Sequence, residues 1–320
     1  MKSIFYLILI ILTGCSDSWV DPNKTVWINY DDTSANKSDL ATREDTTDYL
    51  RIAVASMTTP AETFDKYNDL FTYMETGLGK QILLVQRKTY KEVNDLLKAN
   101  KIDMAFICSG AYVAGATDSA FNLFLLPERD NQRYYHAYII ARKDSPIESF
   151  NDLKGKKFVF PDSLSNTGMY YPMHRLHDLE TTPEDFFSET YISNAHDNSI
   201  ELVSRGIVDG ASVNSLVYEY VKQVHPDMVM NVKIIEKSIP FGMPPIVVSR
   251  QIDSLLRKDI HSVLTNMVKS KEGRDILRNL MFNRFVSDSD TLYDGIRAMY
   301  HDINDINERS NATKKLLSSK

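Results

Sequence analysis

Short apolar runs alternate with helical patterns through the middle of the chain. Three of these runs and the helical patterns between them predict a βαβαβ unit, with strands at residues 51–56, 82–85 and 104–108. A second unit of the same kind follows residues 138–140. Its expected strands are residues 157–160, 189–192, 210–213 and 232–235, and one more strand is expected at 246–248. Because strands alternate with helices, the pattern favours an α/β fold with mainly parallel sheets flanked by helices.

Two capping boxes mark the starts of the first helices. The sequence Thr59-Pro60-Ala61-Glu62 opens the first helix, and Thr89-Tyr90-Lys91-Glu92 opens the second. Gly77 is the expected end of the first helix, because glycine adopts the left-handed conformation of a C-terminal cap at little cost. After residue 248 only helical patterns follow, up to about residue 303.

The length of 320 residues suggests two domains. Since helical patterns follow the two α/β units, the chain is expected to return to the first lobe and finish there. We therefore expect residues 50–138 and 241–307 in lobe 1 and residues 139–240 in lobe 2. Residues 16–49 are rich in polar side chains and predict a flexible tether, and residues 308–320 predict a polar tail.

The first 15 residues have the pattern of an export signal. Lys2 precedes an apolar run from Ile4 to Leu12, which is shorter than the roughly 20 residues that span a bilayer. Small residues then precede Cys15, and this pattern resembles the bacterial lipobox, whose cysteine is acylated. We expect an extracytoplasmic protein that lipid on Cys15 anchors to a bacterial membrane, on the periplasmic side or at the cell surface. An uncleaved anchor would explain neither the small residues nor the polar sequence that follows.

The net charge argues against one class of binding partner, and the cysteine content argues against a disulfide. The chain has a net charge of −6, and loss of Lys2 with the signal would make it more acidic still. Such a protein is not expected to bind nucleic acid. Cys108 is the only other cysteine, so no disulfide is expected once Cys15 carries lipid.

Catalytic motifs are missing from the sequence. It contains no nucleophile elbow, no zinc-protease motif and no phosphate-loop lysine. His174 and His177 are spaced i, i+3, but a solvated helix surface is the favoured interpretation of that pair. We therefore expect a binding protein rather than an enzyme, with no cofactor and no metal, and a surface hydrolase is the weakest alternative.

A candidate anion site follows the expected strand at residues 157–160. Ser165, Asn166 and Thr167 stand in sequence where the next helix begins. The start of a helix binds anions through its free backbone N–H groups and the positive end of its dipole. Ordinary capping of the helix by Ser165 or Thr167 explains the same residues. The sequence leaves both interpretations open.

Further polar side chains are expected around the same crevice. His196 and Asp197 follow the expected strand at residues 189–192, and either ligand binding or helix capping explains them. Ligands of open α/β sheets collect at the carboxyl ends of strands. Ser109 and Tyr112, after the strand at 104–108, and Tyr90, at its helix start, would face the crevice from the other lobe. Neither polar loop of the second lobe contains arginine, which favours a ligand held by hydrogen bonds that can be released.

Several short stretches carry a resemblance to a known family by their order and spacing. They are residues 51–57, 85–90, 105–112, 165–168 with Pro172, 194–197, 206–211 and 244–248. On these stretches the chain resembles the PhnD-like substrate-binding proteins of ABC importers for phosphate, phosphite and phosphonates, and the resemblance covers residues 51 to 304.

The resemblance implies a two-lobed periplasmic-binding-protein fold that closes on its ligand and delivers it to a membrane permease, acting as a monomer. Family members hold the phosphoryl oxygens with groups that match Ser165, Asn166 and Thr167 and with a histidine that matches His196. Tyrosines that match Tyr90 and Tyr112 reach in from the other lobe, near Ser109.

Two departures from the family pattern bear on the ligand. The hydroxyl-rich triplet is Ser-Asn-Thr here, and Asn214 stands where some members have a carboxylate for a ligand amine. An amine-free phosphorus oxyanion is therefore expected. A ligand-sensing receptor of the same fold, coupled to a membrane kinase, and a diverged binder of another small anion are the alternatives.

Overall fold

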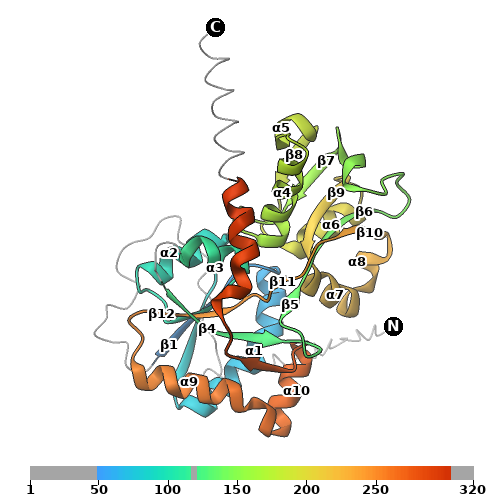
Figure 1. Cartoon of the computed structure of the whole chain (residues 1–320). Coiled ribbons are helices and arrows are strands. Elements are labelled where there is room, and N and C mark those ends of the chain that lie inside the picture. Colours follow the sequence, from blue (N-terminus) through green and yellow to red (C-terminus); the bar gives the residue numbers. More distant parts are fainter. Residues whose placement is uncertain (1–48, 117–120, 304–320) are drawn as a thin grey trace, which may run out of the picture.

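A computed structural model of the chain describes residues 49–116 and 121–303. Within these ranges the chain forms two α/β lobes, one at the bottom and one at the top of Figure 1. The predicted signal peptide with Cys15, the polar tail and the predicted tether up to residue 48 lie outside the described residues. Tyr49, the last residue of the predicted tether, is instead the first residue of a strand. Among the described residues, no helix combines the length and the apolar character that crossing a membrane requires.

The first lobe is built on a six-stranded sheet in the order β13-β4-β12-β3-β1-β2. Strand β1 pairs in parallel with β2 and β3, whereas β12 is antiparallel to β3 and β4, and β13 is antiparallel to β4. The strands are β1 (Tyr49–Val54), β2 (Gln81–Val85), β3 (Met104–Phe106), β4 (Phe121–Glu128), β12 (Ile246–Ser249) and β13 (Arg284–Val286). The sheet is therefore mixed, and the expectation of a mainly parallel sheet is wrong for this lobe, because β12 also runs antiparallel to β3. Strands β4 and β13 were not expected from the sequence.

Alternating side chains of β1 enter two different cores. Leu50, Ile52 and Val54 pack with helices α1, α9 and α10, whereas Ala53 faces the opposite core, which includes α2 and α3. This period of two is expected for a strand covered on both faces. The helical segments of this lobe are α1 (Pro60–Leu78), α2 (Tyr90–Lys98), α3 (Ser109–Ala116), α9 (Ser254–Asn266), η5 (Met267–Lys269), α10 (Lys271–Asn279) and η6 (Asp290–Tyr293).

The second lobe is built on a five-stranded sheet in the order β10-β6-β9-β7-β8. Strand β7 is parallel to β8 and β9, whereas β6 is antiparallel to β9 and β10. The strands are β6 (Ala137–Arg142), β7 (Lys157–Phe160), β8 (Glu189–Ile192), β9 (Gly210–Asn214) and β10 (Val232–Lys237). The helical segments are η3 (Phe150–Leu153), η4 (Asn166–Tyr170), α4 (Tyr171–Asp178), α5 (Pro183–Phe186), α6 (His196–Ser204), α7 (Ser215–Val224) and α8 (Pro226–Met230).

Two short strands carry the chain between the lobes. Strand β5 (Tyr134–Tyr135) pairs antiparallel with β11 (Phe241–Gly242) in a small sheet of its own. Because Ala137 already pairs with Asn214, the chain enters the second sheet two residues before the boundary expected at residue 139. Figure 1 shows β5 and β11 side by side between the lobes.

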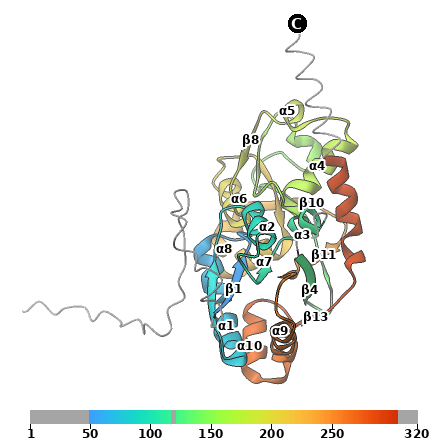
Figure 2. The ribbon, with the colours of Figure 1, turned by 90° about the vertical axis from the view of Figure 1, so that its left-hand side faces the viewer.

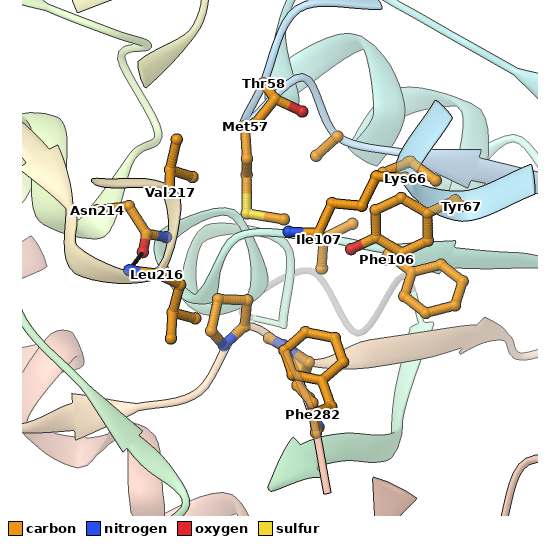
Figure 3. A pocket seen from close by; sticks show the side chains of 15 residues that line it. Met57, Thr58, Lys66, Tyr67, Phe106, Ile107, Asn214, Leu216, Val217 and Phe282 are labelled. Atoms are coloured by element: carbon orange, nitrogen blue, oxygen red, sulfur yellow. Dashed lines mark hydrogen bonds between the residues drawn. The ribbon is translucent and has the colours of Figure 1, made fainter. Parts of the chain in front are cut away.

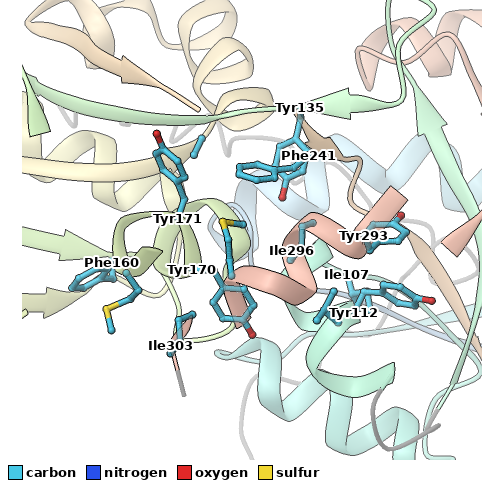
Figure 4. Close-up of a cluster of buried hydrophobic side chains, with 14 of the residues drawn as sticks. Ile107, Tyr112, Tyr135, Phe160, Tyr170, Tyr171, Phe241, Tyr293, Ile296 and Ile303 are labelled. Carbon is cyan, nitrogen blue, oxygen red and sulfur yellow. The ribbon is translucent and has the colours of Figure 1, made fainter. Parts of the chain in front are cut away.

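The last described helix, residues 294–303, contacts both lobes rather than finishing in the first. It starts beside the first lobe and runs upward along the second in both views (Figures 1 and 2). The ring of Tyr300 lies 5.4 Å from that of Tyr170, and Asp302 accepts a hydrogen bond of 2.8 Å from His174 in α4. The buried cluster drawn in Figure 4 therefore includes Ile296 and Ile303 beside residues of the second lobe.

The two predicted capping boxes have different outcomes. The box at Thr89 is confirmed, because its hydroxyl accepts from the Glu92 N–H and the Glu92 carboxylate accepts from the Thr89 N–H. At Thr59 the prediction is wrong, since the side chain makes no capping hydrogen bond. The carboxylate of Glu62 instead accepts a hydrogen bond of 2.9 Å from Tyr220, across the gap between the lobes.

The predicted end of the first helix is also wrong by two residues. The helix ends at Leu78, and Gly79 is the left-handed cap, with φ of 62°. Gly77 lies inside the helix, where a Cβ atom would be 2.9 Å from a methyl group of Val263 on α9. Packing against α9, rather than helix termination, accounts for Gly77.

Candidate functional site

Polar loops from both lobes meet between the two sheets. Ser165, Asn166 and Thr167 stand at the start of η4, directly after β7, and all three are fully buried. His196, which begins α6 after β8, is also fully buried. Tyr90 and Ser109, from the first lobe, are the first residues of α2 and α3. Helix starts after parallel strands thus converge on one crevice, as expected for this fold.

His196 is held in one neutral form. Its Nδ1 atom accepts a hydrogen bond of 3.1 Å from the backbone N–H of Asn214, so the ring proton is on Nε2. The Nε2 atom lies 3.2 Å from the Ser165 hydroxyl. Burial lowers the pKa of His196 to about 3, and the ring therefore remains neutral at physiological pH. The site thus contains a histidine that donates a hydrogen bond without adding charge.

Ser165 both caps the helix and retains a proton to donate. Its oxygen accepts a hydrogen bond of 3.0 Å from the Gly168 N–H and a second one from the His196 ring. A hydroxyl oxygen has two lone pairs, and these bonds use both of them. The hydroxyl proton of Ser165 is therefore directed toward a further acceptor, such as the oxygen of an anionic ligand.

Tyr135 is a site residue that the sequence analysis missed. Its hydroxyl oxygen accepts a hydrogen bond of 3.1 Å from the Asn166 amide and lies 2.5 Å from the Ser109 hydroxyl. Tyr135 stands on β5, so it connects the first lobe, the second lobe and the crossing strand. The one signal for it in the sequence is its place just before the predicted change of lobe.

Several buried polar atoms of this crevice have no hydrogen-bond partner among the described residues. They are the Tyr90 hydroxyl, Thr167 Oγ1, Asn166 Oδ1 and Asn214 Nδ2. Burial holds the pKa of Tyr90 well above its usual value, so this hydroxyl keeps its proton. An unpartnered buried polar group costs about 1 to 3 kcal/mol. Their concentration in one crevice therefore indicates a polar ligand.

Two aspartates link the lobes around these groups. The Asp162 carboxylate, in the second lobe, accepts a hydrogen bond of 3.0 Å from the Tyr90 N–H in the first. The Asp197 carboxylate accepts a hydrogen bond of 2.8 Å from the backbone N–H of Thr59. The backbone N–H of the neighbouring His196 donates a hydrogen bond to the carbonyl oxygen of Met57. Burial raises the pKa of both carboxyl groups. The lobes are thus in contact around the crevice, in a closed arrangement.

Backbones of the two lobes come close together at Gly110. A Cβ atom added there would lie 2.4 Å from the carbonyl oxygen of Leu164 and 2.6 Å from the backbone nitrogen of Asn166. Gly110 belongs to α3 of the first lobe, whereas the other two residues belong to the second. The absence of a side chain at Gly110 is therefore what allows the lobes to close at this point.

Tyr112 does not join the other predicted site residues. Its hydroxyl donates a hydrogen bond to Asp290, and its ring lies 4.7 Å from that of Tyr293. Figure 4 shows Tyr112 beside Tyr293, away from Tyr135. The second tyrosine hydroxyl of the crevice is thus that of Tyr135, which reaches it from β5.

A possible set of metal ligands lies elsewhere, on α4. The nearest ligand atoms of His174, His177 and Asp178 lie within 4.8 Å of one another, and His174 also bonds Asp302. Asp178 follows His174 at i+4, a spacing that the sequence analysis overlooked. Three ligands on the partly exposed surface of one helix are fewer than a structural zinc site uses.

Comparison with known proteins agrees with this geometry. A family model described as ABC transporter, phosphonate, periplasmic substrate-binding protein matches residues 52–293. The phosphonates-binding periplasmic protein of Escherichia coli (strain K12) is 24% identical over 222 residues, which cover 68% of this chain and 65% of that protein. The phosphate-import protein PhnD of Mycolicibacterium smegmatis is 26% identical over 187 residues, 55% of this chain and 58% of that protein. The chain thus spans slightly less than two thirds of the length of these relatives.

Solved structures show the same fold at low sequence identity. The binding protein component of an ABC phosphonate transporter from Pseudomonas aeruginosa matches with a TM-score of 0.74 at 18% identity, over 85% of this chain and 98% of that one. PhnD1 from Prochlorococcus marinus, in complex with methylphosphonate, matches with a TM-score of 0.73 at 17% identity, over 80% of this chain and 98% of that one. The predicted two-lobed α/β fold is thereby confirmed. Since the family model covers well over half of the sequence, this chain belongs to the family of periplasmic substrate-binding proteins of phosphonate ABC transporters.

Proposed function

We propose that this protein is the substrate-binding component of an ABC importer and that it holds a small phosphorus oxyanion between its lobes. The observation that carries the proposal is the convergence of buried, uncharged donors in one crevice. The hydroxyls of Tyr90 and Thr167 have no partner there within the described part of the chain, and Ser165 has a proton to donate. Family membership and the methylphosphonate bound to PhnD1 of Prochlorococcus marinus support the same class of ligand.

Neutral donors suit a ligand that must be released to a permease. A hydrogen bond to a charged group contributes about 1.5 to 3 kcal/mol, so several of them suffice to hold an oxyanion without an arginine clamp. Closure of the lobes would bring Tyr90 from the first lobe onto an anion held by Ser165 and Thr167 in the second. Opening would remove that contact and free the ligand.

The hydrogen-bond acceptors of the crevice favour the binding of a phosphorus oxyanion over the binding of sulfate. Asn166 Oδ1 is buried and has no partner among the described residues, whereas the amide nitrogen of the same side chain donates to Tyr135. A protonated phosphorus oxygen can donate a hydrogen bond to it, whereas fully ionised sulfate has no proton to offer. The carboxyl groups of Asp162 and Asp197 nearby would also disfavour a full double charge.

A ligand panel tests this proposal. We expect phosphate, phosphite or methylphosphonate to raise the melting temperature, since a ligand at 100 times its Kd adds about 2.7 kcal/mol to the free energy of unfolding. Sulfate and 2-aminoethylphosphonate should bind more weakly in calorimetry. The absence of stabilisation by any phosphorus oxyanion, or tightest binding of sulfate, would contradict the proposal. Uptake of the ligand by cells with and without the protein separates an importer component from a sensor.

We also propose that lipid on Cys15 anchors the protein to the membrane, with residues 16–48 as the tether. The pattern of the first 15 residues supports this, as does the family's extracytoplasmic location. We expect the Cys15→Ser variant to lose its membrane attachment, because a serine cannot form the thioether to the lipid. Fractionation of cell membranes measures the effect. If the variant stays in the membrane pellet as fully as the unmodified sequence, the anchor is of another kind.

A further inference from the structure

A cavity adjoins the polar residues of the oxyanion crevice. It has a volume of about 40 Å³ and lies between the lobes. Ala55 lines it and belongs to the same apolar cluster as Tyr90, against which Met57 also packs, while Asn214 lines it and bonds His196 through its backbone N–H. The cavity therefore borders residues of the crevice on both lobes. Figure 3 shows the cavity with its labelled side chains.

The wall of this cavity is mostly apolar and contains no carboxylate. Much of the wall consists of the rings and methyl groups of five side chains, which are Tyr67, Phe106, Ile107, Leu216 and Phe282. About 10 to 15 Å³ of such space holds one water molecule, so the cavity has room for roughly three groups of that size. A carboxylate, with three non-hydrogen atoms, matches this volume.

Two nitrogen donors face the cavity from opposite lobes. The Asn214 amide is oriented by its oxygen, which accepts a hydrogen bond of 2.8 Å from the Leu216 N–H. Its nitrogen is buried and unpartnered among the described residues, and Figure 3 shows it pointing toward Met57. The Lys66 side chain extends from α1 into the same space (Figure 3).

Lys66 is a cation that makes no ion pair within the described residues, although the charge of Glu62, one turn earlier in α1, also acts on it. No ion pair links it to any of the described carboxylates, and its nearest described interaction is with the ring of Tyr220, 4.4 Å from the ammonium nitrogen. Burial and, to a smaller extent, the charge of Arg129 lower the pKa of Lys66 to about 8, and the carboxylate of Glu62 opposes the shift. The side chain therefore remains mostly charged at neutral pH. A partly buried, unpaired cation is costly, and an anion placed beside it would relieve that cost.

On the basis of the proposed function, we propose that this cavity receives a small acidic substituent of the phosphorus ligand and that Lys66 and Asn214 bind it. The substrate class is then a short phosphonate that carries a carboxylate, such as phosphonoacetate. Both nitrogen atoms are donors, so a carboxylate satisfies them together. An ammonium substituent would meet the like charge of Lys66 and would find no carboxylate in the wall.

Calorimetry with phosphonoacetate, methylphosphonate and 2-aminoethylphosphonate tests the inference. We expect phosphonoacetate to bind roughly ten- to one-hundredfold more tightly than methylphosphonate, because a hydrogen bond between charged groups supplies that difference. The Lys66→Met variant should reduce the ratio of these two affinities by a similar factor. Lys91→Met removes an equal charge from the exposed surface of α2, where Lys91 pairs with Asp95, and should leave the ratio unchanged.

The outcomes separate this inference from the proposed function. If methylphosphonate binds but phosphonoacetate binds no more tightly, the cavity does not select an acidic substituent, and the phosphonate-binding function stands. The same conclusion follows if Lys66→Met leaves the ratio unchanged. If phosphate, phosphite and both phosphonates all fail to bind, the proposed function itself is wrong. A melting curve without ligand checks that Lys66→Met folds, and Lys66→Gln provides a polar alternative if it does not.

Discussion

The Gly110→Ala variant is expected to bind its ligand about five- to more than one-hundredfold more weakly than the unmodified protein. A methyl group at this position would lie 2.4 Å from the carbonyl oxygen of Leu164 and 2.6 Å from the backbone nitrogen of Asn166. Backbone atoms cannot turn aside as a flexible side chain can, so the lobes would have to stay further apart. Overpacking of this kind typically costs about 1 to 3 kcal/mol, which corresponds to that range of affinity.

The open form of the same variant should be as stable as the unmodified protein, or more so. The contacts at Gly110 are with the other lobe, and within α3 alanine is favoured over glycine by about 0.5 to 1 kcal/mol. Calorimetry gives the affinity, and melting curves with and without ligand give the stability of both forms. Gly295→Ala is the matched control, because a Cβ atom there meets nothing within 4 Å. Unchanged affinity in Gly110→Ala would show that this contact is not needed for binding.

The Thr167→Val variant is expected to lose ligand affinity by roughly ten- to one-hundredfold. Thr167 is fully buried and its hydroxyl has no partner among the described residues, whereas valine has nearly the same shape. A hydrogen bond to a charged oxyanion contributes about 1.5 to 3 kcal/mol, and this variant removes one. Without ligand the variant should be no less stable, because it removes a buried hydroxyl that is unpartnered.

This experiment also separates binding from capping, the two interpretations that the sequence left open. In the structure Ser165, not Thr167, accepts the hydrogen bond of the helix start. Thr182 provides a matched control, since its hydroxyl caps α5 by accepting from the Asp185 N–H. Thr182→Val should lower stability by about 1 kcal/mol and leave affinity unchanged. If Thr167→Val behaves in the same way, Thr167 is not a ligand-binding residue.

The sequence alone was sufficient to predict the two α/β units and the loops that form the crevice. The strand expected at residues 51–56 is β1 (Tyr49–Val54), and the one expected at residues 157–160 is β7. Both were predictable because apolar alternation and capping depend on residues a few positions apart. The same reasoning located the helix starts with Ser165 and His196, since polar residues between a strand and a helix stand at the carboxyl end of the sheet.

Only the tertiary structure decided which partner each polar group has. Glu62 had the spacing of a capping box but bonds Tyr220 of the other lobe. Tyr112 had the position of a site residue, yet Tyr135 on β5 occupies the crevice. No pattern in the sequence distinguishes Lys66 from the other charged residues of the first helix, yet its ammonium nitrogen lies 4.4 Å from the ring of Tyr220 in the second lobe. One hydrogen bond contributes a net free energy of only about 1 kcal/mol to folding. Which partner a polar side chain takes is therefore decided by contacts between residues far apart in the chain.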